Sequence, residues 1–77
     1  MSRFDWLHDP ALWVETVPGR LEFTISRTVF CQRSCVAESD WKLELLAWRC
    51  RQLVTTGLMY EVTQQADEDL LCFAKDA

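Results

Sequence analysis

Residues 40–56 carry apolar side chains on two opposite sides of one predicted helix, and this pattern constrains the fold more than any other part of the chain. At about 100° per residue, six apolar side chains fall on one side with the spacing of a core-facing helix. These are Leu43, Leu46, Ala47, Cys50, Leu53 and Val54. Trp41, Leu45 and Trp48, here called the tryptophan stripe, fall on the opposite side. We assign the first side to the core, so something else must cover the tryptophan stripe.

The ends of this helix are marked by capping residues. Ser39 or Asp40 can cap its start, and Gly57 can adopt the left-handed conformation that commonly ends a helix. Glu44 near the start and Arg51 near the end agree with the sign of the helix dipole. The sequence therefore predicts a helix over residues 40–56.

Four other segments are predicted as strands. Pro18-Gly19 has the chemistry of a tight turn between the first two. In the second strand apolar and polar residues alternate, and Arg27 interrupts the apolar side, so we expect the strand to bend, bulge or run past the core there. Polar residues turn the chain between the third strand and the fourth. The four predicted strands cover residues 12–17, 21–31, 58–63 and 70–74.

The predicted order of elements is strand, strand, helix, strand, strand, and a chain of 77 residues is long enough for one domain. We expect an α+β fold in which one antiparallel or mixed sheet has the long helix packed across it. Residues 1–11 are predicted as an N-terminal arm and residues 12–77 as the α+β core.

The chain is acidic, with a net charge of −4 and a cluster of carboxylates near its C-terminus. This charge opposes non-specific attraction to nucleic acids and anionic lipids. The chain opens without a basic and then apolar leader, and it has no apolar run of the about 20 residues that span a bilayer. We therefore expect a soluble cytosolic protein with reduced thiols that binds neither DNA nor membranes directly.

Residues that carry chemistry are few. Cys31 and Cys35 form one closely spaced pair, but a structural zinc site needs a second pair of cysteines or histidines. His8 is the only histidine, and no local context activates a thiol beside it. We therefore expect that the chain is not an enzyme and that it binds no metal or cofactor. The alternative hypothesis is a small metal-binding or redox module built from Cys31, Cys35, Cys50 and Cys72.

The tryptophan stripe, with Arg49 and Arg51 beside it, has the aromatic and arginine-rich composition that protein interfaces favour. A host protein, a second copy of the chain, or the chain's own aromatic residues near the N-terminus could cover it. The first of these gives our leading hypothesis, a protein-binding domain. The acidic residues Asp67, Glu68 and Asp69 are a second predicted contact, able to mimic nucleic-acid phosphates on a basic partner.

In length, acidity and predicted order of elements, the whole chain resembles small inhibitors that bacteriophages encode against host machinery, such as anti-CRISPR proteins and phage inhibitors of bacterial RNA polymerase. Several of these are single α+β domains. The resemblance implies a phage or mobile-element protein that acts in the host cytosol by steric occlusion of a larger protein complex, with a binding surface and no active site.

Overall fold

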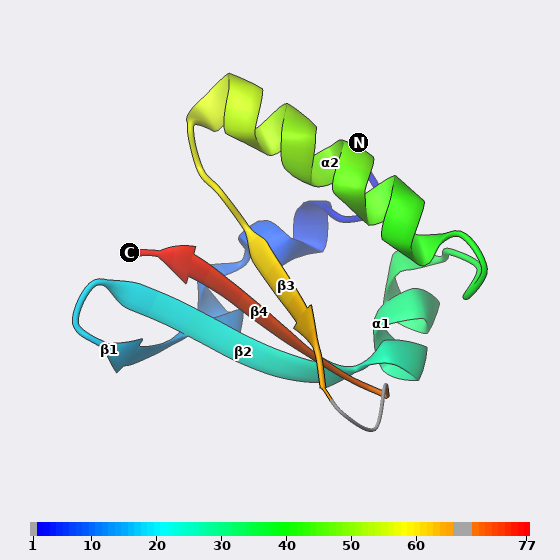
Figure 1. The fold of residues 1–77 in the computed structure, drawn as a ribbon, viewed down its shortest axis with the longest axis horizontal. Helices are drawn as coiled ribbons and strands as arrows, with labels where there is room; N and C mark the ends of the chain where they lie inside the picture. The colour runs from blue at the N-terminus through cyan, green and yellow to red at the C-terminus, as the bar shows by residue number, and fades with distance from the viewer. Residues whose placement is uncertain (1, 66–68) are drawn as a thin grey trace.

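The computed structural model describes residues 2–65 and 69–77 and contains a four-stranded antiparallel sheet with two α-helices (Figure 1). The strands are β1 (Val14–Val17), β2 (Arg20–Ser26), β3 (Glu61–Gln64) and β4 (Leu70–Asp76), in the spatial order β1-β2-β4-β3. The helices are α1 (Arg27–Ser34) and α2 (Trp41–Thr56), preceded by the short 3₁₀ turns η1 (Asp5–His8) and η2 (Pro10–Leu12). The predicted α+β class is confirmed, and the sheet is antiparallel throughout its described strands.

The first hairpin forms where the sequence predicts it. Gly19 has a φ of 84°, which suits the turn between β1 and β2, and Val17 pairs with Arg20 across it. The register shifts between Glu15 and Val17, so β1 carries an irregularity.

The predicted second strand is too long, because β2 ends at Ser26 and α1 begins at Arg27. The side chain of Ser26 accepts a hydrogen bond from the backbone N–H of Val29 at 3.3 Å and so caps α1. Over residues 27–31 the alternating pattern is also compatible with a helix, which buries Phe30 and Cys31 on one side. The interruption at Arg27 marks the end of the strand rather than a bulge within it.

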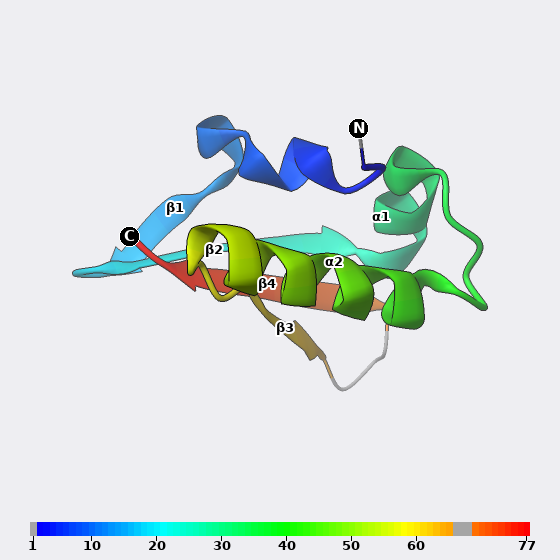
Figure 2. The same ribbon diagram turned by 90° about the horizontal axis from the view of Figure 1, so that it is seen from above.

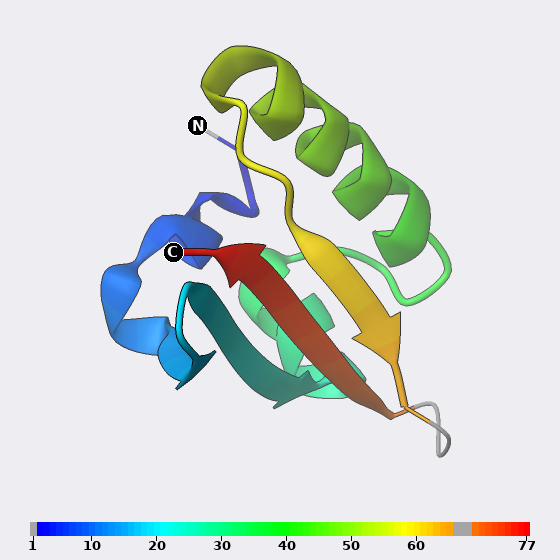
Figure 3. The same ribbon diagram turned by 60° about the vertical axis from the view of Figure 1, so that its left-hand side comes forward.

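The two faces of the sheet differ in character. Leu71 and Phe73 of the central strand β4 are buried on the face that packs against the helices, and the rings of Phe73 and Phe23 lie 5.0 Å apart. On the other face the Arg20 guanidinium pairs with Glu22 and Glu61. In Figure 3 the strands β2, β4 and β3 lie in front, α1 lies behind them, and α2 runs along the β3 side. The core therefore lies between one face of the sheet and the helices.

The N-terminal arm is part of this core. Phe4 and Leu7 are almost completely buried, and the Phe4 ring stacks on that of Phe30 with 5.8 Å between ring centres. The indole N–H of Trp13 donates to the Leu7 carbonyl oxygen at 2.9 Å. Figure 2 shows the N-terminal segment along one flank of α2 and β3 along the other.

Helix α2 matches its predicted bounds within one residue. Gly57 ends it with a φ of 73°, and its N–H donates to the Leu53 carbonyl at 3.0 Å. At the other end, Asp40 holds the predicted capping position, without a side-chain hydrogen bond to the helix. Of the helices in residues 2–65 and 69–77, none has the length and apolar character needed to cross a membrane.

Cys35, which ends α1, is a left-handed residue other than glycine, with a φ of 54°. Because this conformation costs about 1–2 kcal/mol for a residue with a side chain, we expect Cys35→Gly to raise the free energy of unfolding by about 0.5–1 kcal/mol, the entropy of glycine offsetting the rest. Urea unfolding followed by circular dichroism measures this change. Cys35→Ala is the matched control and should show no such gain. Equal stability of the two variants would contradict the prediction.

Candidate protein-interaction surface

The tryptophan stripe is buried, so the prediction that it forms the contact surface is wrong. Trp41, Leu45 and Trp48 are 5%, 2% and 0% exposed. Each indole buries about 150–250 Å² and packs well against other aromatic rings, and the aromatic residues near the N-terminus supply such partners. Of the three coverings considered from the sequence, the chain's own aromatic residues are the one observed.

Trp48 is covered mainly from the N-terminal segment. Its ring lies 6.2 Å from that of Phe4, 5.3 Å from that of His8 and 5.0 Å from that of Tyr60. Its indole N–H donates to the Asp5 carboxylate at 3.2 Å. This hydrogen bond stabilises the charged carboxylate and lowers the pKa of Asp5 below its ordinary value of 3.8. The N-terminal segment thus covers the apolar ring of Trp48 and accepts a hydrogen bond from its N–H.

The opposite side of α2, here called the outer face, is exposed to solvent. It consists of the six residues assigned to the core from the sequence, and that assignment is wrong. Leu43, Leu46, Leu53 and Val54 are 75%, 50%, 42% and 85% exposed, and Ala47 and Cys50 are also exposed. In Figure 2 none of the described elements lies over α2. Single exposed apolar residues are common on proteins, whereas a contiguous apolar stripe along a helix is unusual on a surface that contacts only water.

The spacing along the outer face is that of a coiled-coil seam. Leu43, Leu46, Cys50 and Leu53 follow one another at intervals of three, four and three residues, as the a and d positions of two heptads do. At 1.5 Å per residue this seam is about 15 Å long. Ala47 and Val54 widen it on the side of the N-terminal segment. The outer face therefore has the shape that a second helix packs against.

Positive charge borders the outer face on both sides. Lys42 and Arg49 lie on the side toward β3, and Arg51 lies on the side toward the N-terminal segment. The Arg49 Nε donates to the Tyr60 carbonyl at 2.7 Å, which fixes this side chain beside the helix. The nearby Glu44 carboxylate is 3.6 Å from the Arg3 guanidinium. Within residues 2–65 and 69–77, Lys42 and Arg51 have no carboxylate partner.

Arg49 and Arg51 were predicted as part of the binding site, and the structure places them at the border of the outer face rather than beside an exposed tryptophan stripe. Asp67 and Glu68 lie outside the described residues. The Asp69 carboxylate accepts from the Thr28 hydroxyl at 3.4 Å and is 4.0 Å from the Arg27 guanidinium. Asp69 therefore has partners within the chain and connects the start of β4 to the start of α1.

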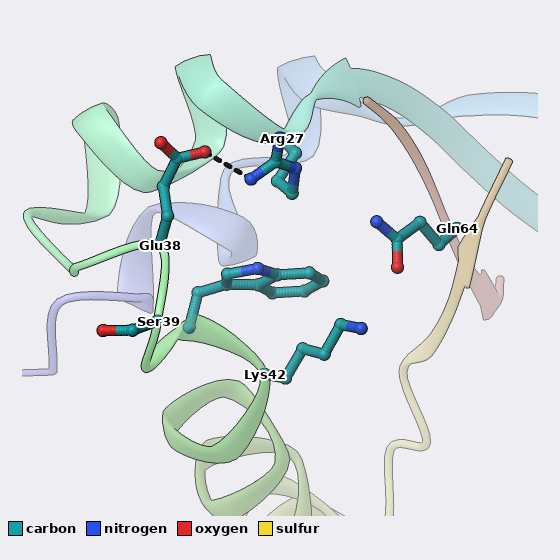
Figure 4. A pocket seen from close by; sticks show the side chains of 6 residues that line it. Arg27, Glu38, Ser39, Lys42 and Gln64 are labelled. Atoms are coloured by element: carbon teal, nitrogen blue, oxygen red, sulfur yellow. Dashed lines mark hydrogen bonds and ion pairs between the residues drawn. The ribbon is translucent and has the colours of Figure 1, made fainter. Parts of the chain in front are cut away.

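A pocket of about 410 Å³ lies between the start of α2, the start of α1 and the end of β3. Figure 4 shows the ion pair between Arg27 and Glu38 on one side of it and Lys42 and Gln64 across from them. A smaller pocket of about 170 Å³ shares Lys42 and Gln64 and extends along α2 toward Arg49. The side chains that line the larger pocket include no cysteine or histidine, the residue types proposed from the sequence as ligands or nucleophiles.

The four cysteines are free thiols. Cys31 is buried in α1, Cys35 ends that helix, Cys50 lies on the outer face and Cys72 lies in β4. Burial raises the pKa of Cys31 and of Cys72, which favours their neutral thiol forms. Among the residues that the structure describes, no three histidine, cysteine, aspartate or glutamate side chains are grouped to hold a metal ion.

His8 contacts aromatic residues in the structure. Its Nδ1 lies 2.9 Å from the Tyr60 hydroxyl, and the two rings are 6.0 Å apart. Tyr60 is 2% exposed, and burial raises the pKa of its hydroxyl. His8, which the sequence places in the N-terminal arm, is the last residue of η1 and helps cover Trp48.

One signal in the sequence could have given the orientation of α2. The segment before the first strand holds Phe4, Trp6 and Leu7, and these residues need an aromatic partner to be buried. The tryptophan stripe is the part of the chain with matching size. Matching the tryptophan stripe to these aromatic residues, rather than counting apolar positions, would have placed the stripe inward.

Comparisons of this chain with protein-family models, with curated proteins and with solved structures found no match. The resemblance to phage inhibitors therefore stays a prediction.

Proposed function

We propose that this chain is a non-enzymatic protein-binding domain whose contact surface is the outer face of α2. One observation carries the proposal. The core is already completed by the tryptophan stripe, yet the other side of the same helix keeps six apolar residues in water. Such a stripe costs solvation free energy and promotes association, so a binding partner gives it a physical reason.

The mode of binding that fits this surface is packing of a helix against an apolar groove or a second helix on the partner. A domain of this size bound in that way would occlude part of a larger host protein or complex. It would act as an inhibitor or an adaptor, as the resemblance to mobile-element inhibitors implies.

The test is a double variant, Leu43→Glu with Leu46→Glu. Both side chains are at least half exposed, so the fold should persist, while charges in the centre of the outer face should weaken a complex by about tenfold or more. The partner is first isolated from cells that express the tagged wild-type chain, and its dissociation constant is then measured with purified proteins. Val17→Glu, at a similarly exposed position on β1, is the matched control.

Circular dichroism and the melting temperature show whether each variant is folded. The proposal is wrong if the isolated partner binds the folded double variant as tightly as it binds the wild type, or if no partner can be isolated.

A further inference from the structure

The outer face offers a partner a shape that a helix fits. Its a and d spacing matches the period of packed helices, and it is about 15 Å long at 1.5 Å per residue. A standard protein interface takes about 800 Å² from each partner, which is roughly one sixth of the 4909 Å² surface of this molecule. Six side chains of one helix cannot supply that area alone. A partner that reaches this size must therefore also contact the borders of the face.

Those borders are cationic on both sides, although the chain as a whole is acidic. Lys42 and Arg49 flank the seam toward β3, and Arg51 flanks it toward the N-terminal segment. Lys42 is adjacent to Leu46, and Arg51 is adjacent to Ala47 and Val54, at helical intervals of three or four residues. The complement of this arrangement is an apolar stripe with carboxylates on both of its sides.

A second copy of the chain does not provide that complement. If two outer faces met in antiparallel orientation, Lys42 and Arg49 of one copy would lie beside the same residues of the other. In parallel orientation they would lie beside Arg51. Cations would face cations in both arrangements, and such contacts disfavour pairing.

A membrane surface fits the outer face less well than a protein does. Helices that lie in a lipid interface commonly carry tryptophan or phenylalanine on the apolar side and a strongly basic polar side. Here the aromatic residues of α2 face the core, and the net charge of −4 opposes approach to anionic lipid.

We infer that the outer face of α2 binds an amphipathic helix of another protein, in which aspartate or glutamate flanks the apolar stripe on both sides. This partner class rests on the proposed protein-binding function and adds to it the shape and the charge of the occupant. The apolar seam supplies affinity, and the cationic borders select the partner and exclude a second copy.

The test compares two labelled peptides of three heptads that share leucine and isoleucine at the a and d positions. One has glutamate at all flanking positions, and the other has lysine. Fluorescence anisotropy at low salt should show about tenfold tighter binding of the glutamate peptide, and high salt should reduce this preference. The variant Lys42→Glu with Arg51→Glu should prefer the lysine peptide. Arg33→Glu, which reverses an exposed cation on α1, is the control and should keep the wild-type preference.

Three outcomes would overturn the inference. The first is equal or weaker binding of the glutamate peptide. The second is a dimer, detected by light scattering, whose two copies can be crosslinked through Cys50 in the Cys35→Ser variant. This result would make a second copy the occupant of the outer face. The third is binding to phosphatidylserine vesicles that is lost in the Leu43→Glu, Leu46→Glu variant.

The same variants separate this inference from the proposed function. One outcome is that the Leu43→Glu, Leu46→Glu variant no longer binds a purified cellular partner, while the wild type binds the glutamate and lysine peptides equally. In that case the protein-binding function stands and the acidic partner class is wrong. If no partner depends on the outer face, the proposed function itself is wrong.

Discussion

Trp48→Ala is expected to destabilise the domain strongly. Trp48 is fully buried against three aromatic rings, and its indole N–H donates a hydrogen bond to the Asp5 carboxylate. Emptying such a site costs about 3–5 kcal/mol. At 0.05–0.15 kcal/mol per residue, a domain of this length has a total stability of only about 4–12 kcal/mol. The variant therefore loses a large fraction of its stability, whereas an exposed contact residue could be truncated without unfolding.

The measurement is the free energy of unfolding from urea titrations followed by far-ultraviolet circular dichroism. Leu43→Ala removes an apolar side chain from the outer face of the same helix and is the matched control. We expect it to change stability by less than about 0.5 kcal/mol. A stable Trp48→Ala variant, or an equal loss in both, would contradict the orientation of α2 in the structure.

Removing residues 1–8 is expected to abolish cooperative folding of the remaining chain. The deletion takes away the buried side chains of Phe4 and Leu7 and opens the covered side of Trp48. It also removes the Trp6 indole N–H that donates to the Ser34 hydroxyl at 3.0 Å. Ser34 is only 1% exposed in the intact chain and would lose this hydrogen-bond partner. Two large cavities and one lost buried hydrogen bond together cost more than about 5 kcal/mol.

Near-ultraviolet circular dichroism and thermal unfolding of the shortened chain measure this effect. Arg3→Ala in the full chain is the control for the exposed part of the same segment. It removes the ion pair with Glu44 and the hydrogen bond to the Cys35 carbonyl, and exposed pairs of this kind contribute about 1 kcal/mol or less. A sharp thermal transition in the shortened chain would show that the segment is an appendage rather than part of the core.

Local signals predicted most of the secondary structure. The Pro18-Gly19 turn and the terminating Gly57 each require a specific backbone conformation, and both stand where the sequence places them. Strand β4 covers the predicted segment. Strand β3 begins later than predicted, at Glu61, because Leu58 and Met59 connect it to α2 outside the sheet.

The packing of the elements against one another could not be predicted from the same signals. The two apolar sides of α2 are equivalent under a test of periodicity, and only the aromatic residues of the N-terminal segment decide between them. The predicted core side and the predicted binding side of α2 are therefore exchanged in the structure, although Arg49 and Arg51 do lie beside the exposed side. The segment 27–31 is ambiguous in the same way, since five residues are too few to separate a period of two from one of 3.6.

Strand β4 lies between β2 and β3 in the sheet although it follows both of them in the sequence. On the ribosome, the β1–β2 hairpin and α2 emerge before β4, and β3 must wait for β4, with which it pairs. The pairing of β2 with β4 joins segments separated by most of the chain, and such contacts slow folding. Until residues 70–76 are available, β2 and β3 therefore each lack the strand that joins them into one sheet.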